Sequence, residues 1–292
     1  MSHASEEIAS QPSCWRAAIE VAAAKPAGLP EPGERVAVIG CGTSWFVAQA
    51  YAVLRERAGQ GETDAFTASE FPVSRRYDRV VAISRSGTTT EILRALSQID
   101  RPAKITAITA VAGSPVRDQA DEVLTLGFAD EQSVVQTRFP TTLITLLRAH
   151  LGEDVTGLPG QAERALGLPL PDDLDGFRQF TFLGSGWTLG LAHEAALKVR
   201  EAAQAWSESY SGMEYRHGPI AVADIASLVW VFGDAPHGLL DEVRATGAHV
   251  EVSLLDPLAE LVRAQRMAVG LADRRGLDVD APRHLTRSVI LT

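Results

Sequence analysis

Ser84 to Glu91 carries five hydroxyl side chains within seven positions. The segment follows an apolar run, Val80 to Ile83, and leads into a helical pattern, and Gly87 allows a tight turn between the two. Hydroxyl groups and the free amides of a helix start can together wrap an anionic group such as a phosphate. A hydroxyl-rich helix cap with no ligand is the alternative interpretation.

A second set of chemical groups lies in the other half of the chain. Glu194, Lys198 and Glu201 are spaced by four and three residues, so they share one face of a helix. That face is either an exposed stripe of ion pairs or a source of acid, base and cation. Downstream, the polar and aromatic segment 208–219 contains glycine breakers and presents His217, which favours an active-site loop over a packed element.

The elements that position these groups alternate along the chain. Short β-branched runs and longer amphipathic runs follow one another, which predicts parallel sheets covered by helices. Strands are expected near 35–39, 63–66, 80–84, 104–110, 122–126, 179–183, 227–232 and 250–254. Helices are expected near 6–24, 44–58, 89–97, 140–151, 189–203, 238–246 and 258–274.

The two halves begin alike, since Val38 to Ser44 (VIGCGTS) is echoed by Phe182 to Thr188 (FLGSGWT). An internal duplication is therefore expected. The segment 152–175, rich in Gly and Pro around one short helical piece, reads as the connection between the copies. The predicted fold is α/β with two tandem domains, each a doubly wound, flavodoxin-like parallel sheet flanked by helices. The expected parts are an N-terminal helix (1–26), a first domain (27–151), a linker (152–175), a second domain (176–276) and a C-terminal tail (277–292).

Composition excludes several function classes. The 292 residues are 46% hydrophobic and carry a formal net charge of -10, which disfavours a nucleic-acid surface. No window is apolar enough for a membrane span, so we expect a cytoplasmic protein. Two cysteines and no metal-ligand spacing of His predict no metal. The Gly40-x-Gly42 pattern leaves a dinucleotide site as an alternative, but Trp45 at the third glycine position disfavours it, and we expect no cofactor.

Three ordered blocks of the sequence resemble the sugar isomerase (SIS) domain family, and most closely the isomerase half of glucosamine-6-phosphate synthase. The first joins Gly40-Cys41-Gly42-Thr43-Ser44 to Ser84-x-Ser86-Gly87-x-Thr89. The second runs from Ala196-Leu197-Lys198-x-x-Glu201 to Arg216-His217-Gly218-Pro219, and the third is Asp278-Val279-Asp280-Ala281-Pro282-Arg283. The resemblance covers nearly the whole chain.

The resemblance implies a role for each candidate residue. It implies that Glu201 is the base that moves a proton between C2 and C1, that Lys198 is the cation beside it, and that His217 opens the sugar ring from the neighbouring subunit of a homodimer. It also implies that the tail folds over the sugar site. Phosphate would be held by Ser44, Ser84, Arg85, Ser86 and Thr89, and the sugar by Gly42, Thr43, Val134, Gln136 and Arg287.

Departures from the resemblance narrow the expected function. No glutaminase region precedes the isomerase region, so ammonia delivery from glutamine is not expected. Arg287 stands where the synthase has Lys, Thr88 where it has Glu, and Gln136 where it has Ser. An arginine can bind or polarise a substrate oxygen but not form a Schiff base in practice. The substrate is therefore expected to differ from fructose-6-phosphate.

The expected function is an isomerase/deaminase that acts on an amino-sugar 6-phosphate such as glucosamine-6-phosphate, with a phosphorylated sugar as its partner molecule. The same C2 carbanion could instead expel the C3 oxygen of an N-acetylated sugar phosphate, which makes a lyase or dehydratase the first alternative. A non-catalytic phosphosugar sensor is the second, because one fold hosts many functions.

Overall fold

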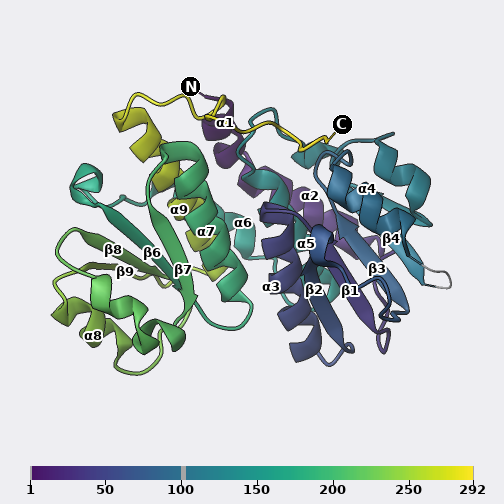
Figure 1. The fold of residues 1–292 in the computed structure, drawn as a ribbon, viewed down its shortest axis with the longest axis horizontal. Coiled ribbons are helices and arrows are strands. Elements are labelled where there is room, and N and C mark those ends of the chain that lie inside the picture. The colour runs from purple at the N-terminus through teal and green to yellow at the C-terminus, as the bar shows by residue number, and fades with distance from the viewer. Residues whose placement is uncertain (1, 100–102, 292) are drawn as a thin grey trace.

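Two parallel β-sheets with a layer of helices between them form the fold (Figure 1). The structure is a computed structural model that describes residues 2–99 and 103–291. Thr292, the last residue of the predicted tail, lies outside the described residues. The expected α/β class with helix-flanked parallel sheets is confirmed.

The first sheet has five strands in the order β2-β1-β3-β4-β5. Its order reverses between β1 and β3, and ligands of such open sheets bind beyond the carboxyl ends of the strands at this switch point. Every residue of β1 and β3 is buried, because helices cover both faces. The strands are β1 Val36–Gly40, β2 Thr63–Thr67, β3 Arg79–Ile83, β4 Lys104–Thr109 and β5 Glu122–Thr125.

The second sheet has four strands in the order β7-β6-β8-β9, which repeats the order of the first four strands of the other sheet. All its pairings are parallel. The strands are β6 Gln179–Gly184, β7 Ser207–Ser211, β8 Ser227–Val231 and β9 His249–Glu251.

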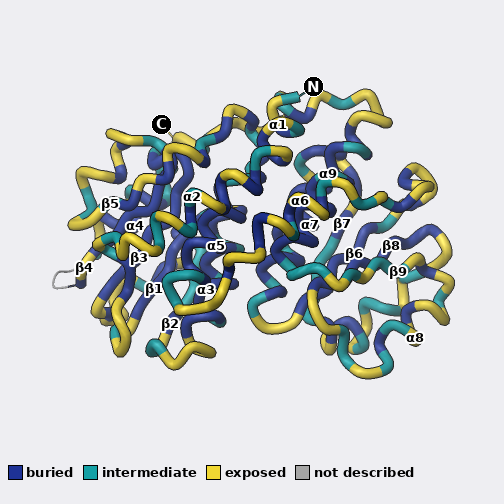
Figure 2. Tube along the Cα trace, turned by 180° about the vertical axis from the view of Figure 1, so that it is seen from behind, coloured by how far each residue is buried: buried dark blue, intermediate teal, exposed yellow. Residues whose placement is uncertain are grey.

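One hydrophobic core joins the two halves. It includes Val38 of β1 and Phe182 of β6, together with residues of the intervening helices. Separate clusters lie on the outer faces of the two sheets, under α4 and α8. Figure 2 shows the buried strands and central helices as a continuous dark region. The helices are α1 His3–Ala9, α2 Gln11–Ala23, α3 Thr43–Arg57, α4 Thr90–Ser97, α5 Arg138–His150, α6 Leu158–Gly167, α7 Thr188–Ala203, α8 Leu239–Ala245 and α9 Pro257–Arg274.

Two expectations about elements need correction. The single leading helix is two helices that meet at Ser10, because Pro12 occupies the first turn of α2 and cannot continue the hydrogen bonds of α1. The expected loop 208–219 begins with an edge strand, β7, whose polar, half-buried residues give no apolar alternation. The short helical piece expected within 152–175 is α6, which packs on α2 and α9 within the shared core.

None of the helices in the described ranges combines the length and the apolar character that crossing a bilayer requires.

Candidate active site

The hydroxyl-rich loop connects β3 to α4 at the switch point of the first sheet. Ser84 Oγ lies 3.3 Å from Thr89 Oγ1 and accepts the Gly87 amide at 3.1 Å, and Ser86 Oγ accepts the Thr88 amide at 3.2 Å. Ser84 and Ser86 are nearly buried. The loop is therefore a compact set of hydroxyls with fixed positions.

The turn at Gly87 requires glycine. Its φ is +65°, which L side chains rarely adopt, and a Cβ there would lie 2.0 Å from Ser114 Oγ. The neighbouring loop after β4 thus packs directly on the hydroxyl loop and sets its curvature.

The second wall of the site is the start of α3, which follows β1. Gly42 has a φ of +52°, and α3 begins at Thr43. Thr43 and Ser44 are buried in the first turn. Lys198 Nζ of α7 donates to Thr43 Oγ1 at 3.1 Å, so this helix start touches the second half of the molecule.

Glu194, Lys198 and Glu201 form one cluster on α7. Lys198 Nζ is 2.6 Å from Glu201 Oε2 and 3.3 Å from Glu194 Oε1. The side chains of Lys198 and Glu194 are 1% and 3% exposed, whereas that of Glu201 is 20% exposed. The interpretation as an exposed stripe of ion pairs is wrong for this helix.

Burial controls how the cluster holds protons. Burial is the largest cause that raises the pKa of Glu194; the charge of Lys198 lowers this pKa and that of Glu201 raises it. The net pKa is about 7. For Lys198, burial lowers the pKa, but the two carboxylates outweigh burial and the net shift is upward. Two carboxylates thus share one ammonium group. Glu194, the more buried of the two, takes up a proton near neutrality, whereas Glu201 makes the shorter contact with Lys198.

Glu194 is the residue that the sequence reasoning left out of its site. Its neighbours Ala192, Ala195 and Ala196 are all buried. That run of small residues around a charge is the signal that could have identified a buried face.

Arg85 lies in the hydroxyl loop, but its guanidinium does not face the hydroxyls. It is 2% exposed and donates to the carbonyls of Glu131 at 3.1 Å, Ser133 at 3.2 Å and Arg287 at 2.7 Å. The structure therefore places Arg85 as a tie between the hydroxyl loop, the segment 131–133 and the tail, away from the expected phosphate contact.

The segment with Val134 and Gln136 is anchored from a distant part of the chain. Glu7 of α1 accepts the Gln132 amide at 2.5 Å and also accepts the Ser133 hydroxyl. Val134 and Gln136 alternate with buried residues and are half-buried themselves. Gln136 Oε1 is buried and has no hydrogen-bond partner among the described residues.

Arg287 does not point freely at a substrate either. Its Nε donates to the Glu131 carbonyl at 3.0 Å, and its Nη2 lies 2.6 Å from Asp130 Oδ1. These hydrogen bonds link the tail to the segment 130–131.

His217 lies far from Glu201 within one chain. It is exposed and follows the carboxyl end of β7, whereas Glu201 lies in the last turn of α7, at the amino-terminal edge of the same sheet. The helix advances about 20 Å between Thr188 and Glu201 at 1.5 Å per residue. The structure does not bring these two residues together.

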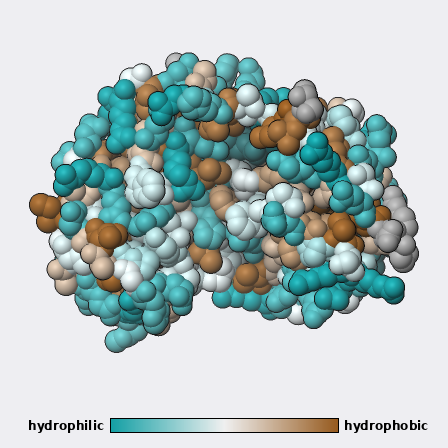
Figure 3. Space-filling model, in the orientation of Figure 1, coloured by the Kyte–Doolittle hydropathy of each residue, from teal (hydrophilic) through white to brown (hydrophobic). Residues whose placement is uncertain are grey.

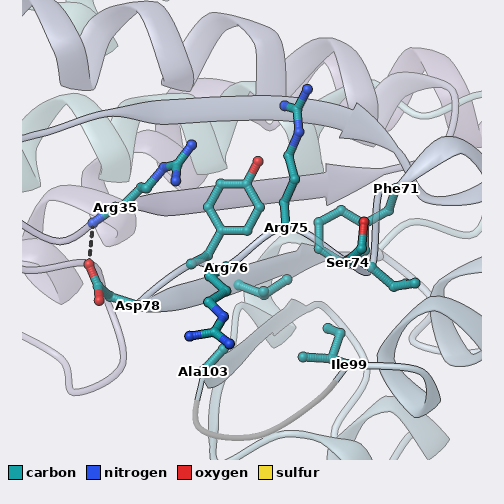
Figure 4. A pocket seen from close by; sticks show the side chains of 11 residues that line it. Arg35, Phe71, Ser74, Arg75, Arg76, Asp78, Ile99 and Ala103 are labelled. Atoms are coloured by element: carbon teal, nitrogen blue, oxygen red, sulfur yellow. Dashed lines mark hydrogen bonds between the residues drawn. The ribbon is translucent and has the colours of Figure 1, made fainter.

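A depression of about 430 Å³ adjoins Glu201. It is lined by Leu197, Arg200, Glu201, Gln204, Ala205, Trp206, Arg283, His284 and Leu285, so the tail forms one of its walls. A larger hollow, about 670 Å³, lies among Arg35, Phe71, Arg75 and Asp78 at the amino ends of β1 and β3 (Figure 4). That edge is opposite the ligand-binding edge of a parallel sheet.

No group of three or more His, Cys, Asp or Glu side chains within residues 2–99 and 103–291 is arranged to hold a metal ion.

A family model matches part of the first half of the chain. Residues 31–149 match the SIS domain model. Over 88% of this chain, the sequence is 31% identical to a glutamine–fructose-6-phosphate aminotransferase of Methanothermobacter thermautotrophicus, and over 90% it is 29% identical to that of Streptomyces coelicolor. The matched regions are 51% and 53% of those enzymes, so the chain spans about half the length of the curated relatives it matches.

Solved structures match over the full length. A glucosamine-6-phosphate deaminase of Thermotoga maritima superimposes with a TM-score of 0.84 and 26% identity, covering 99% of this chain and all of that one. The C-terminal domain of an aminotransferase from Francisella tularensis gives 0.81 at 21% identity, covering 97% and 98%. At 21% identity, the match to the aminotransferase domain shows a shared fold only.

Proposed function

The chain belongs to the SIS-domain proteins, and from that premise we propose that it is an enzyme that moves a proton between C2 and C1 of an amino-sugar 6-phosphate. The 26% identity to a glucosamine-6-phosphate deaminase over both full lengths supports an amine at C2. The observation that carries the proposal is the contact of Lys198 with Thr43, because it joins an acid–base cluster to the loops that carry hydroxyls.

Residues 176–276 are proposed as a second SIS domain after the first at 27–151, both doubly wound. The shared strand order supports this. So does a shared glycine requirement: a Cβ on Gly40 would lie 2.5 Å from the main chain of Ser44, and one on Gly184 would lie 2.3 Å from that of Thr188. In each half the first helix packs closely on the first strand, as duplication predicts.

The phosphate group is proposed to bind at the switch point of the first sheet. Hydroxyl groups there can donate to phosphate oxygens, and the first turns of α3 and α4 add amides. The sugar would extend past Gly42 and Thr43 toward Glu201, beside Val134 and Gln136. The proposed phosphate ligands are Ser44, Ser84, Ser86 and Thr89; Arg85 holds the loop in place.

The reaction follows from the cluster on α7. In the open-chain substrate, the Glu201 carboxylate takes the proton from C2 and returns it to C1. The C2 amine becomes an imine, which water hydrolyses to a ketone with release of ammonia. The ammonium group of Lys198 lies beside the base and stabilises negative charge on the C1 oxygen of the enolamine intermediate, which gains a proton at that oxygen as the C2 amine loses one. Substrate and water thus give a ketose phosphate and ammonia, without any cofactor.

Ring opening requires an acid–base group at the ring oxygen, and His217 is proposed for it. Because His217 and Glu201 lie at opposite edges of the second sheet, the histidine must come from a second copy of the chain. A homodimer with shared active sites satisfies this requirement.

The test is incubation of the protein in deuterated water with glucosamine-6-phosphate, galactosamine-6-phosphate, N-acetylglucosamine-6-phosphate and fructose-6-phosphate, followed by NMR of the C2 proton and the products. Deuterium exchange with ammonia and ketose formation is expected for an amino sugar. Glu201→Gln should reduce turnover by a factor of about 100 or more, the lower range for loss of a general base. Glu70→Gln, a change of an exposed carboxylate, is the matched control.

Other outcomes would replace the proposal. An unsaturated sugar from the N-acetylated substrate would identify a dehydratase. Tight binding of a sugar phosphate without exchange, in the wild type and in Glu201→Gln alike, would identify a sensor.

A further inference from the structure

The C-terminal tail ends on the hydroxyl loop of the first sheet. Figure 1 shows it crossing from α9 to the start of α4. There Ser288 Oγ lies 3.1 Å from Ser86 Oγ and 2.9 Å from Thr88 Oγ1. A hydroxyl from the far end of the chain thus joins the hydroxyl cluster.

Ser288 is held on both sides. Before it, Arg85 donates to the Arg287 carbonyl at 2.7 Å. After it, the Val289 carbonyl accepts the Thr90 amide at 3.2 Å. The Leu291 amide, in turn, donates to Thr90 Oγ1 at 2.9 Å. The main chain therefore fixes the Ser288 side chain over the loop.

The next residues of the tail face away from the loop. Val289, Ile290 and Leu291 are 50%, 66% and 50% exposed, and a hydrophobic patch is visible at this end of the molecule in Figure 3. Ser288, in contrast, is only half-exposed. The Ser288 side chain thus points its hydroxyl at the hydroxyl loop.

We propose that Ser288 is a phosphate-binding residue, whose hydroxyl completes the site formed by Ser84, Ser86 and Thr89. A hydroxyl can donate one hydrogen bond and rotates to suit its partner. A phosphate oxygen that reaches Ser86 is therefore within reach of Ser288. The tail then belongs to the phosphate site as well as covering the sugar. This inference rests on the proposed function.

Binding of a phosphate and ordering of the tail are linked by this contact, and the linkage is reciprocal. Inorganic phosphate should therefore protect the tail from a protease in the wild-type protein. In Ser288→Ala it should protect the tail less at the same phosphate concentration.

The decisive experiment measures binding of inorganic phosphate by calorimetry and the KM and kcat for the sugar phosphate. Ser288→Ala should weaken phosphate binding and raise KM about ten-fold or more, as expected for a hydrogen bond to a charged group, with kcat unchanged. Ser288→Thr keeps the hydroxyl and should restore binding. Ile290→Ala, at an exposed neighbouring position, is the matched control.

The outcomes separate this inference from the proposed function. If Ser86→Ala weakens phosphate binding but Ser288→Ala behaves like Ile290→Ala, the inference is overturned and the phosphate loop stands. If the wild type does not bind inorganic phosphate or any sugar phosphate, both fail. Circular dichroism establishes that each variant is folded.

Discussion

The stability of the protein should depend on pH through Glu194. Its carboxyl is fully buried on α7, and burial raises its pKa from an ordinary 4.5 to about 7. In the unfolded chain the same carboxyl regains its ordinary pKa. The folded protein therefore binds a proton more tightly than the unfolded chain between these two values.

The contribution of Glu194 to stability should fall as the pH rises. Below pH 4.5, Glu194 is protonated in both states and its extra proton affinity contributes fully to stability. As the pH rises through 7, that contribution is lost, because the folded state then has to bury the carboxylate. A shift from 4.5 to about 7 corresponds to about 3 kcal/mol at 1.36 kcal/mol per pKa unit, most of it between pH 5 and pH 8.

Glu194→Gln removes this titration and keeps the shape of the neutral side chain. Urea unfolding of the variant and the wild type at pH 5 and pH 8 measures the difference in unfolding free energy. The variant should gain about 2–3 kcal/mol relative to the wild type from pH 5 to pH 8. Glu70→Gln should show no such change. Parallel pH profiles for Glu194→Gln and the wild type would refute the burial argument.

Three further predictions concern the contacts that hold the site together. Arg85→Met should lower the unfolding free energy by about 2–4 kcal/mol in urea unfolding, because the carbonyls of Ser133 and Arg287 lose this donor and that of Glu131 keeps only Arg287. Gly87→Ala should cost about 1–3 kcal/mol from its positive φ alone and abolish phosphate binding in calorimetry, and Ser114→Gly in the same chain should recover part of both by relieving the close contact. Mixing inactive Glu201→Gln and His217→Ala proteins should restore about one quarter of wild-type turnover, as two-fold symmetry gives one intact site in half of the dimers; no recovery would contradict the shared site.

The strands that the sequence predicted best are those buried on both faces. β1, β3 and β8 each contain a run of four apolar residues, and such runs occur where helices cover both sides of a parallel sheet. β7 has no such signal: as an edge strand it reads Ser-Glu-Ser-Tyr-Ser, and only its pairing with β6 makes it a strand.

The site shows the same division between local and long-range information. The hydroxyl loop and its glycine are local features, and the sequence predicted them as a unit. The contacts of Arg85 depend on carbonyls 46 to 202 positions away in the chain. Neither these acceptor carbonyls nor the hydrogen bond from Ser133 to Glu7, 126 positions away, produces a local sequence pattern. An arginine in a phosphate-like loop therefore looked like a phosphate ligand although its hydrogen bonds are structural.

The direction of the two sheets explains why one chain does not bring His217 to Glu201. Helices α3 and α7 pack against each other in opposite directions: Thr43 at the start of α3 meets Lys198 near the end of α7, while Arg57 at the end of α3 lies against Gly186 just before α7. The hydroxyl loops and the acid–base cluster therefore share one junction. His217 follows the carboxyl end of β7, so it lies at the edge of the second sheet opposite to Glu201. The proposed ring-opening role of His217 therefore requires a second copy of the chain.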